Sequence, residues 1–232
     1  INSGKLYLTD EEHHYLTNVL RLKPNQQVEL FDGQGTTASA TIESIQKKQI
    51  ELMAHDVKKV TPDFKNITVA LALLDKERTY WVIEKLTEIG VKKIIWFFST
   101  RNLNKKSINK QNQQSRWQRC ALAATRQSGR VFLPKIDGPI SLPEVIQSDF
   151  DSCLVGVPPS FYLENREVNS LISILHSLNG SVMLLVGPEG GFTIEEYRNI
   201  FEHGFMAVNF GKHTMRVETA AITGAGIISA KP

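Results

Sequence analysis

Two segments near the C-terminus combine residue types that could hold a ligand. In Gly187–Gly191, three glycines surround Pro188 and Glu189, directly after the apolar run Val182–Val186. Because glycine has no Cβ, its backbone N–H and C=O groups can approach a ligand closely, although a purely structural turn can have the same composition. The segment lacks the Lys-Ser/Thr pair of a P-loop and is not a G-x-G-x-x-G turn, so it does not favour ATP or a dinucleotide. Thr193 is expected to cap the helix that follows, with Glu196 completing a capping box.

The second segment, Phe210–Ala221, follows the apolar run Met206–Asn209. Small residues recur at its end and beyond, so a helix from about Glu218 can pack with its backbone close to a neighbour. The polar start of this helix, with Arg216 and Glu218, is costly to bury unless the charges are paired. A surface ion pair at a helix N-terminus is therefore the structural alternative to a ligand contact.

Positive charge is concentrated between Arg101 and Ile136, where nine basic residues occur without one Asp or Glu. The chain as a whole has a net charge of +3. Such segregation favours a polyanion such as nucleic acid, whereas a solvated charged surface is the alternative. On the wheel of a helix predicted at Gln113–Ser128, four arginines fall within an arc of about 80°. The nine basic residues are Arg101, Lys105, Lys106, Lys110, Arg116, Arg119, Arg126, Arg130 and Lys135.

The composition is that of a globular protein, with 41% hydrophobic and 22% charged residues. No apolar run reaches the roughly 20 residues that span a bilayer, and Ile1–Tyr7 does not resemble a secretory signal. We therefore expect a soluble, cytoplasmic protein without a membrane partner. The chain opens at Ile1 and not at Met, so we also expect a short piece to precede it. Cys120 and Cys153 lack zinc-ligand spacing, and we expect neither a disulfide nor a metal site.

The elements in residues 1–60 are predicted to be short antiparallel strands of a small β-barrel domain. Tight turns punctuate an alternating pattern, most clearly at Asp32–Gly35. Thr9 is expected to cap a short helix carrying His14, with Glu12 at capping-box spacing. The polar segment Lys58–Asn66 is the predicted linker. The predicted strands are Gln27–Phe31, Thr36–Ile45 and Gln49–Met53.

Residues 66–232 alternate apolar strand-like runs with helical patterns, which predicts an α/β domain with a mostly parallel sheet covered on both faces. Ligands of such sheets bind beyond the carboxyl ends of the strands. The loops after Leu74, Phe98, Val157, Val186 and Asn209 are therefore the candidates. The predicted strands are Ile67–Leu74, Lys93–Phe98, Ser152–Val157, Val182–Val186 and Met206–Asn209. The predicted helices are Tyr80–Ile89, Gln113–Ser128, Glu167–Leu178, Ile194–His203 and one from about Glu218.

The two C-terminal segments, taken in order, resemble the signature of RsmE-type 16S ribosomal RNA uridine-N3 methyltransferases of the SPOUT superfamily. Gly187–Glu196 matches the family pattern G-P-E-G-G-F/L-S/T-x-x-E, and Phe210–Ala220 matches L-G-x-R-I/V-L-R-x-E-T-A/T. The resemblance covers nearly the whole chain. The other matching segments are His14–Leu22 with Phe31–Gly33, Lys76–Val91 and Ala123–Arg130. The chain departs from the family pattern at five positions: Asn25 replaces the usual Gly, Thr100 and Arg126 each replace Glu, Phe210 replaces Leu, and His213 replaces Arg.

The resemblance implies a SPOUT-type domain with a deep C-terminal trefoil knot, preceded by a PUA-like barrel that binds RNA. It also implies a homodimer, with the helix Val217–Ala230 at the interface, and S-adenosylmethionine as methyl donor without a metal. The substrate would be N3 of a uridine in 16S ribosomal RNA within the small subunit. The implied donor-binding residues are Val157, Pro158, Gly187, Glu189, Gly190, Gly191, Phe210, Gly211, Thr214, Met215 and Arg216.

For catalysis, Arg216 and Arg130 are the predicted positive groups near the oxygen that develops charge in the uracil anion. Glu189 is the candidate general base, but it fits equally well as a carboxylate that bonds loop amides. Two other functions remain open: a tRNA ribose 2'-O-methyltransferase of the same fold, and a non-catalytic RNA-binding or ribosome-assembly protein. The predicted RNA contacts are His14, Arg21, Arg101, Arg116, Arg119, Arg126 and Arg130.

Overall fold

The computed structural model describes residues 1–62, 66–101, 110–163 and 166–230. The chain forms two compact units, Ile1–Asp63 and Phe64–Pro232. No helix within the described ranges is long and apolar enough to cross a membrane.

The first unit is a four-stranded antiparallel sheet in the order β1-β4-β3-β2, with a short helical segment beside it. Small and branched side chains of β3 and β4 alternate into its core, among them Ala40, Ile42, Ile50 and Leu52, which are fully buried. Leu16 of the helical segment closes this core. The elements are β1 (Gly4–Thr9), α1 (Asp10–His14), the π-helical η1 (Tyr15–Val19), β2 (Gln27–Phe31), β3 (Thr36–Ile45) and β4 (Gln49–Lys59).

The sequence-based bounds of β2 and β3 are confirmed, but β1 was not predicted and β4 continues past Met53 into the segment expected to be a linker. The predicted capping box at Thr9 is wrong. Thr9 stands at the N-cap position of α1 without a side-chain cap, and its hydroxyl lies 3.0 Å from Asp10 Oδ2. Thr9 is also the last residue of β1 and pairs with Gln49, so its backbone has the extended conformation of the strand.

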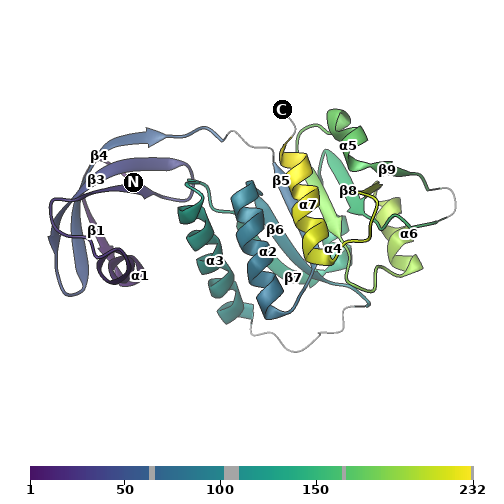
Figure 1. Cartoon of the computed structure of the whole chain (residues 1–232), viewed down its shortest axis with the longest axis horizontal. Helices are drawn as coiled ribbons and strands as arrows, with labels where there is room; N and C mark the ends of the chain where they lie inside the picture. The colour runs from purple at the N-terminus through teal and green to yellow at the C-terminus, as the bar shows by residue number, and fades with distance from the viewer. Residues whose placement is uncertain (63–65, 102–109, 164–165, 231–232) are drawn as a thin grey trace. The chain divides into compact units, whose positions relative to one another are not determined.

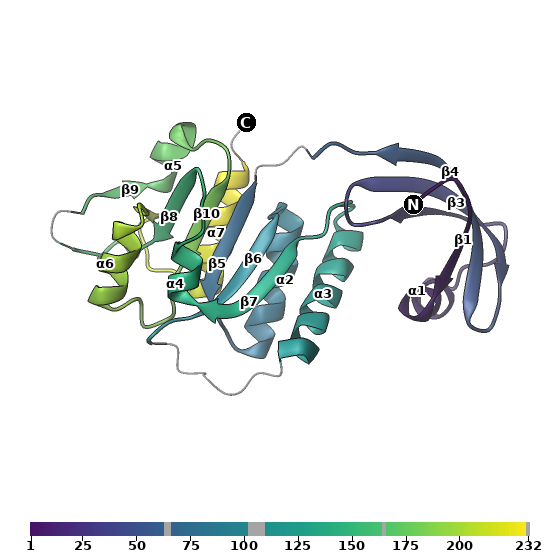
Figure 2. The ribbon, with the colours of Figure 1, turned by 180° about the vertical axis from the view of Figure 1, so that it is seen from behind.

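The second unit contains a seven-stranded parallel sheet in the order β7-β6-β5-β10-β8-β11-β9 (Figure 2). Every residue of the central strands β5 and β10 is buried, as expected for continuous apolar runs covered on both faces. The strands are β5 (Ile67–Ala72), β6 (Lys93–Phe98), β7 (Lys135–Ser141), β8 (Ser152–Gly156), β9 (Val168–Ser170), β10 (Val182–Val186) and β11 (Met206–Asn209).

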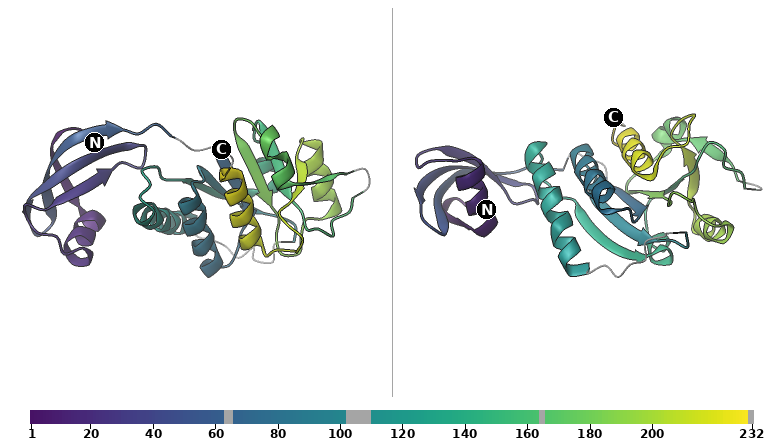
Figure 3. Two further views of the ribbon diagram at one scale, coloured as in Figure 1. Left: turned by 45° about the horizontal axis from the view of Figure 1, so that its top comes forward. Right: turned by 60° about the horizontal axis from the view of Figure 1, so that its bottom comes forward.

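Helices cover both faces of this sheet (Figures 1 and 3). On one face, α2 (Lys76–Ile89), α3 (Lys110–Gln127) and α7 (Val217–Ser229) share a core with the sheet. On the other face, α4 (Leu142–Ile146) and α6 (Ile194–Glu202) form a second core. The layers therefore leave the two ends of the strands free for loops, which is where a ligand of a parallel sheet binds.

The predicted helix Glu167–Leu178 is wrong. Its first part is the edge strand β9, whose residues Val168–Ser170 pair with β11, and only short helical turns follow, α5 (Leu171–Ile174) and η2 (Leu175–Ser177). Strand pairing thus overrides the local helical pattern. The edge strand β7 was missed because it contains Gly138 and Pro139, which punctuate a sequence but are tolerated at the border of a sheet.

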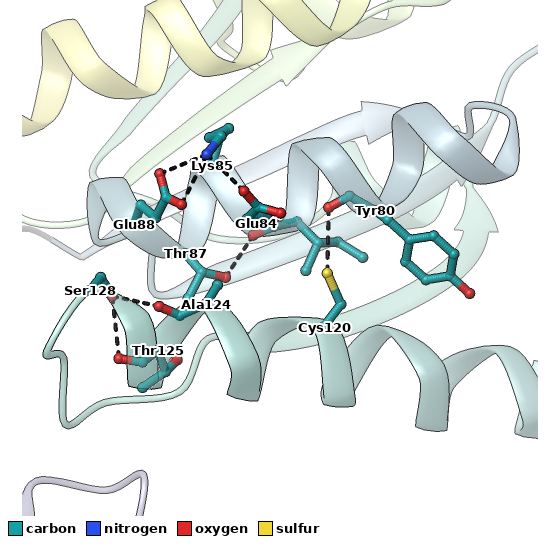
Figure 4. A network of polar contacts seen from close by, with 10 residues as sticks. Tyr80, Glu84, Lys85, Thr87, Glu88, Cys120, Ala124, Thr125 and Ser128 are labelled. Atoms are coloured by element: carbon teal, nitrogen blue, oxygen red, sulfur yellow. Dashed lines mark hydrogen bonds and ion pairs between the residues drawn. The ribbon is translucent and has the colours of Figure 1, made fainter. Parts of the chain in front are cut away.

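Contacts between α2 and α3 fix the orientation of the basic helix (Figure 4). Cys120 Sγ lies 3.5 Å from the carbonyl oxygen of Tyr80, and Trp117 is buried against Trp96 with ring centroids 5.7 Å apart. This face of α3 therefore packs onto α2 and the sheet, while Arg116 and Arg119 are exposed. The predicted packed face is observed, but only part of the predicted cationic face is exposed, since Arg126 is partly buried and Arg130 lies beyond the end of α3.

Candidate functional site

A pocket of about 730 Å³ lies at the carboxyl ends of three adjacent strands, β8, β10 and β11. Its volume lies in the range of small-molecule sites, roughly 300–1,000 Å³. Three loops supply most of its walls, as the sheet topology predicts. The lining residues are Arg78, Gly156, Val157, Pro158, Pro159, Val186, Gly187, Pro188, Glu189, Gly190, Gly191, Tyr197, Phe210, Gly211, His213, Thr214, Met215, Arg216, Val217 and Ala220.

The eleven residues predicted to hold a cofactor all line this one pocket, although they come from segments far apart in the sequence. None of the described residues in the loops after β5 and β6 lines it, but α2 contributes Arg78 and α6 contributes Tyr197. Neither residue was singled out as a site residue. For Arg78 the only available signal was its place in the family-like motif of the first helix.

The Gly187–Gly191 loop is a tight turn that enters α6. Gly191 has φ +67°, a conformation that favours glycine, and its N–H donates to the Pro188 carbonyl at 2.8 Å. A Cβ on Gly187 would lie 2.8 Å from the buried Phe192 ring. Gly187 and Gly191 are thus required by the fold of the turn, which does not conflict with their lining the pocket.

The capping box predicted after this loop is confirmed. Thr193 Oγ1 accepts from the Glu196 N–H at 3.1 Å, and Glu196 Oε2 accepts from the Thr193 N–H at 2.8 Å. The other carboxylate oxygen of Glu196 accepts from the backbone N–H of Thr100 at 2.7 Å. One carboxylate therefore joins the start of α6 to the segment that follows β6.

Arg101 lies directly after this tethered residue. Its Nη1 donates to the Gly190 carbonyl at 2.6 Å, so a residue predicted to contact RNA is held against the glycine loop. The basic tract therefore begins at the pocket. Lys105 and Lys106 fall outside the described residues, as does the side chain of Lys110.

A network of opposite charges joins the pocket walls around Arg78. Asp75, the N-cap of α2, accepts from the Arg78 backbone N–H at 3.0 Å and from its Nε at 2.5 Å. These two bonds hold the pKa of Asp75 below its usual value. Arg78 Nη1 donates to Glu189 and lies 3.7 Å from Glu218 Oε2. Glu218 is buried, so the surface ion pair considered for the start of α7 is instead a buried contact with Arg78.

The structure does not bring Arg130 to the pocket that Arg216 lines. The Arg130 guanidinium donates to the Thr87 carbonyl at the end of α2 and packs beside Gly90. Burial lowers the pKa of Arg130. Within one chain Arg130 acts as a cap for α2 carbonyl groups, and its catalytic role together with Arg216 stays a prediction.

Tyr197 forms an aromatic wall together with Phe161 and Phe192, at ring-centroid distances of 4.7 Å and 5.3 Å. Burial raises the pKa of Tyr197 to about 12. The ring thus stiffens the start of α6 behind the glycine loop, and its hydroxyl stays protonated at neutral pH.

The other predicted RNA contacts are at the surface of their own units. Arg116 and Arg119 are exposed on α3, and Arg126 is partly buried on the same helix. In the first unit, His14 Nδ1 lies 2.8 Å from Asn18 Nδ2, and Arg21 is exposed with φ +52° just after η1. His14, Arg21 and Arg116 are thus exposed to solvent, as expected for residues that contact a polyanion.

The sequence of the chain matches two protein families. Residues 61–229 match the family described as RNA methyltransferase domain, and residues 8–52 match the RNA methyltransferase PUA domain. The chain is 30% identical to "Ribosomal RNA small subunit methyltransferase E" of Buchnera aphidicola, over 93% of this chain and 84% of that protein. It is also 30% identical to the Mycobacterium bovis protein of the same name, over 98% of this chain and 87% of the other.

Solved structures with the same fold carry related names. A putative methyltransferase from Legionella pneumophila, in complex with S-adenosylmethionine, superposes with a TM-score of 0.86 at 28% identity, covering 99% of this chain and 93% of the other. A ribosomal RNA small subunit methyltransferase E from Neisseria gonorrhoeae, bound to S-adenosyl methionine, gives a TM-score of 0.82 at 27% identity, with 97% and 91% covered.

Proposed function

The chain belongs to the RNA methyltransferase domain family, and on that basis we propose that it transfers a methyl group from S-adenosylmethionine to N3 of a specific uridine in 16S ribosomal RNA of the small subunit. The observation that carries the proposal is the pocket in which the Gly187–Gly191 loop and the Phe210–Arg216 segment meet. The names of the relatives support the small-subunit RNA as substrate, and the PUA-domain match supports RNA binding.

The residues of the pocket fit S-adenosylmethionine. Val157, Phe210 and Met215 offer apolar surface for the adenine, and the glycine loop offers backbone N–H and C=O groups for polar edges. When bound, this donor supplies a methyl group already activated by its sulfonium. The task left for the protein is to orient the RNA base and the donor with respect to each other.

Methylation at N3 requires that uracil lose its imide proton and that the base be exposed from any pairing. Arg216 is exposed at the N-cap of α7 and lines the pocket, so we assign it the stabilisation of negative charge on the uracil oxygen. Glu189 also lines the pocket with a side chain that is 62% exposed, which makes it the candidate to accept the proton. We assign Arg130 a role in RNA binding, supported by its place at the end of the basic helix.

The RNA-binding surface in this proposal comprises Arg101 and the arginines of α3 on the second unit, with His14 and Arg21 on the first. The lack of acidic residues between Arg101 and Ile136 supports it. Phosphate contacts of this kind give most of the affinity and make it strongly dependent on salt. A function on ribosomal RNA also implies that the protein works in the cytoplasm.

We include in the proposal a trefoil knot in the C-terminal part and a homodimer. The knot is an exception to the rule that chains avoid threading, and it is supported by the way residues 210–216, after β11, line the same pocket as the loops after β8 and β10. The dimer is supported by apolar surface on two helices: Trp81 of α2 is 44% exposed, and Ile222 and Ile227 of α7 are only partly buried.

The test is mass spectrometry of ribosomal RNA nucleosides from a strain that lacks the gene, before and after its reintroduction. We expect N3-methyluridine to disappear and to return. Persistence of the modified nucleoside in the deletion strain would refute the proposal. Loss of an alkali-resistant dinucleotide would instead indicate a ribose 2'-O-methyltransferase, and tight RNA binding without methyl incorporation would indicate an assembly protein.

A further inference from the structure

Arg78 lies among three carboxylates at the edge of the pocket. Its guanidinium contacts three carboxylates: Asp75 at the N-cap of its own helix α2, Glu189 in the glycine loop and Glu218 in the first turn of α7. Arg78 itself lines the pocket. Three segments that are distant in sequence are thus joined at one cation.

Each carboxylate contributes differently to this network. The Asp75 bonds to the backbone and to Nε of Arg78 hold the guanidinium at the start of α2. Glu218 has a side chain that is only 7% exposed, and its Oε2 has no hydrogen-bond partner among the described residues, so it depends on the charge of Arg78. Glu189 is 62% exposed and is therefore the solvent-facing end of the network.

We propose that Arg78 is a positioning residue for the methyl-donor pocket, which orders Glu189 and its glycine loop against the start of α7. The inference rests on the proposed function, since it assigns the ligand of the pocket. The planar guanidinium donates in several fixed directions, which lets it bond Asp75 and Glu189 at once while it faces Glu218. A lysine ammonium at the same position would neutralise charge but could not bridge the walls in this geometry.

The test measures S-adenosylmethionine binding by calorimetry to the full chain and to its variants Arg78→Gln, Arg78→Lys and Glu189→Gln. For Arg78→Gln we expect affinity to fall by about tenfold, equivalent to ~1.4 kcal/mol. Arg78→Lys should recover only part of this loss. For the Arg78 variants at saturating donor, the turnover number should change far less than KM for the donor, because Arg78 positions the binding loop, whereas Glu189→Gln is compared by donor affinity alone.

The matched control is Lys85→Gln on the same helix. Lys85 pairs with Glu84 and Glu88 away from the pocket (Figure 4), and its side chain is 32% exposed against 30% for Arg78. This variant removes a comparable ion-pair network, so its donor affinity should equal that of the wild type. An equal loss of affinity in both variants would mean a general effect on stability and would overturn the inference.

A double variant tests the path through Glu189. If Arg78 acts on the loop through this carboxylate, Arg78→Gln should weaken donor binding less in the Glu189→Gln background than in the wild type. Additive effects would overturn the inference. Should Arg78→Gln not fold, the conservative Arg78→Lys and the exposed Glu189→Gln still test the inference. Unchanged donor affinity in both of these variants would overturn the inference. A wild-type chain that does not bind S-adenosylmethionine would overturn the proposed function and this inference together.

Discussion

Replacing Glu196 by alanine should loosen the start of α6 and, with it, the glycine loop. The Glu196 carboxylate accepts from the backbone N–H groups of Thr193 at 2.8 Å and of Thr100 at 2.7 Å. A hydrogen bond to a charged group contributes about 1.5–3 kcal/mol when buried, and less for a partly exposed carboxylate. With two such bonds lost, we expect the free energy of unfolding to fall by ~2–3 kcal/mol.

A loss of this size should lower Tm by about 5–10 °C, since 1 kcal/mol corresponds to roughly 2–4 °C for a domain of this size. Circular dichroism during heating measures it. The matched control is Glu202→Ala, which removes an exposed carboxylate at the other end of α6. An acidic residue in the last turn is unfavourable for the helix dipole, so this variant should unfold at the wild-type temperature or slightly above it. Equal Tm values for the two variants would refute the tethering role of Glu196.

Three further predictions concern the pocket, the basic helix and the aromatic wall. Gly190→Val should leave Tm unchanged but abolish donor binding in calorimetry. Among the described residues an added Cβ would meet Arg101 alone, at 3.5 Å, and yet it would block approach to the loop backbone. Arg126→Glu should weaken RNA binding and reduce its salt slope by about one unit, with donor affinity unaltered; an unchanged slope would contradict a phosphate contact. In an ultraviolet titration, Tyr197 should ionise with a pKa of about 12, and Tyr197→Phe should remove this step. Because folding raises this pKa, the tyrosine's contribution to stability is fully present below its ordinary pKa of roughly 10 and should be lost as the pH rises from there through about 12.

The central strands of the second unit were predictable because burial on both faces leaves a continuous apolar run in the sequence. The bounds of β6 and β10 agree with the prediction for this reason. The edge strands β7 and β9 carry no such pattern, since one side of each has no neighbour in the sheet. Their existence depends on pairing with β6 and β11, which no local sequence feature encodes.

The same contrast applies to the site. Glycines and a capping pair leave a local pattern, so the loop at Gly187–Gly191 and its helix were predictable, and strand order then brought the loops together. The partners of charged side chains follow from the tertiary fold. Arg78 faces Glu189 and Glu218 across the pocket, and Arg130 bonds to Thr87, although each looks like a surface cation in the sequence.

The position of β10 inside the sheet affects when the protein can fold during its synthesis. β10 lies between β5 and β8, so Val182 pairs with Ile67 and with Ser152 on its two sides. Contacts between residues so far apart form slowly, because a long chain must be ordered before they are made. During synthesis the amino-terminal strands emerge first and cannot complete their hydrogen bonding until β10 arrives. The glycine loop follows β10 directly, so a nascent or truncated chain that lacks the last third has no pocket.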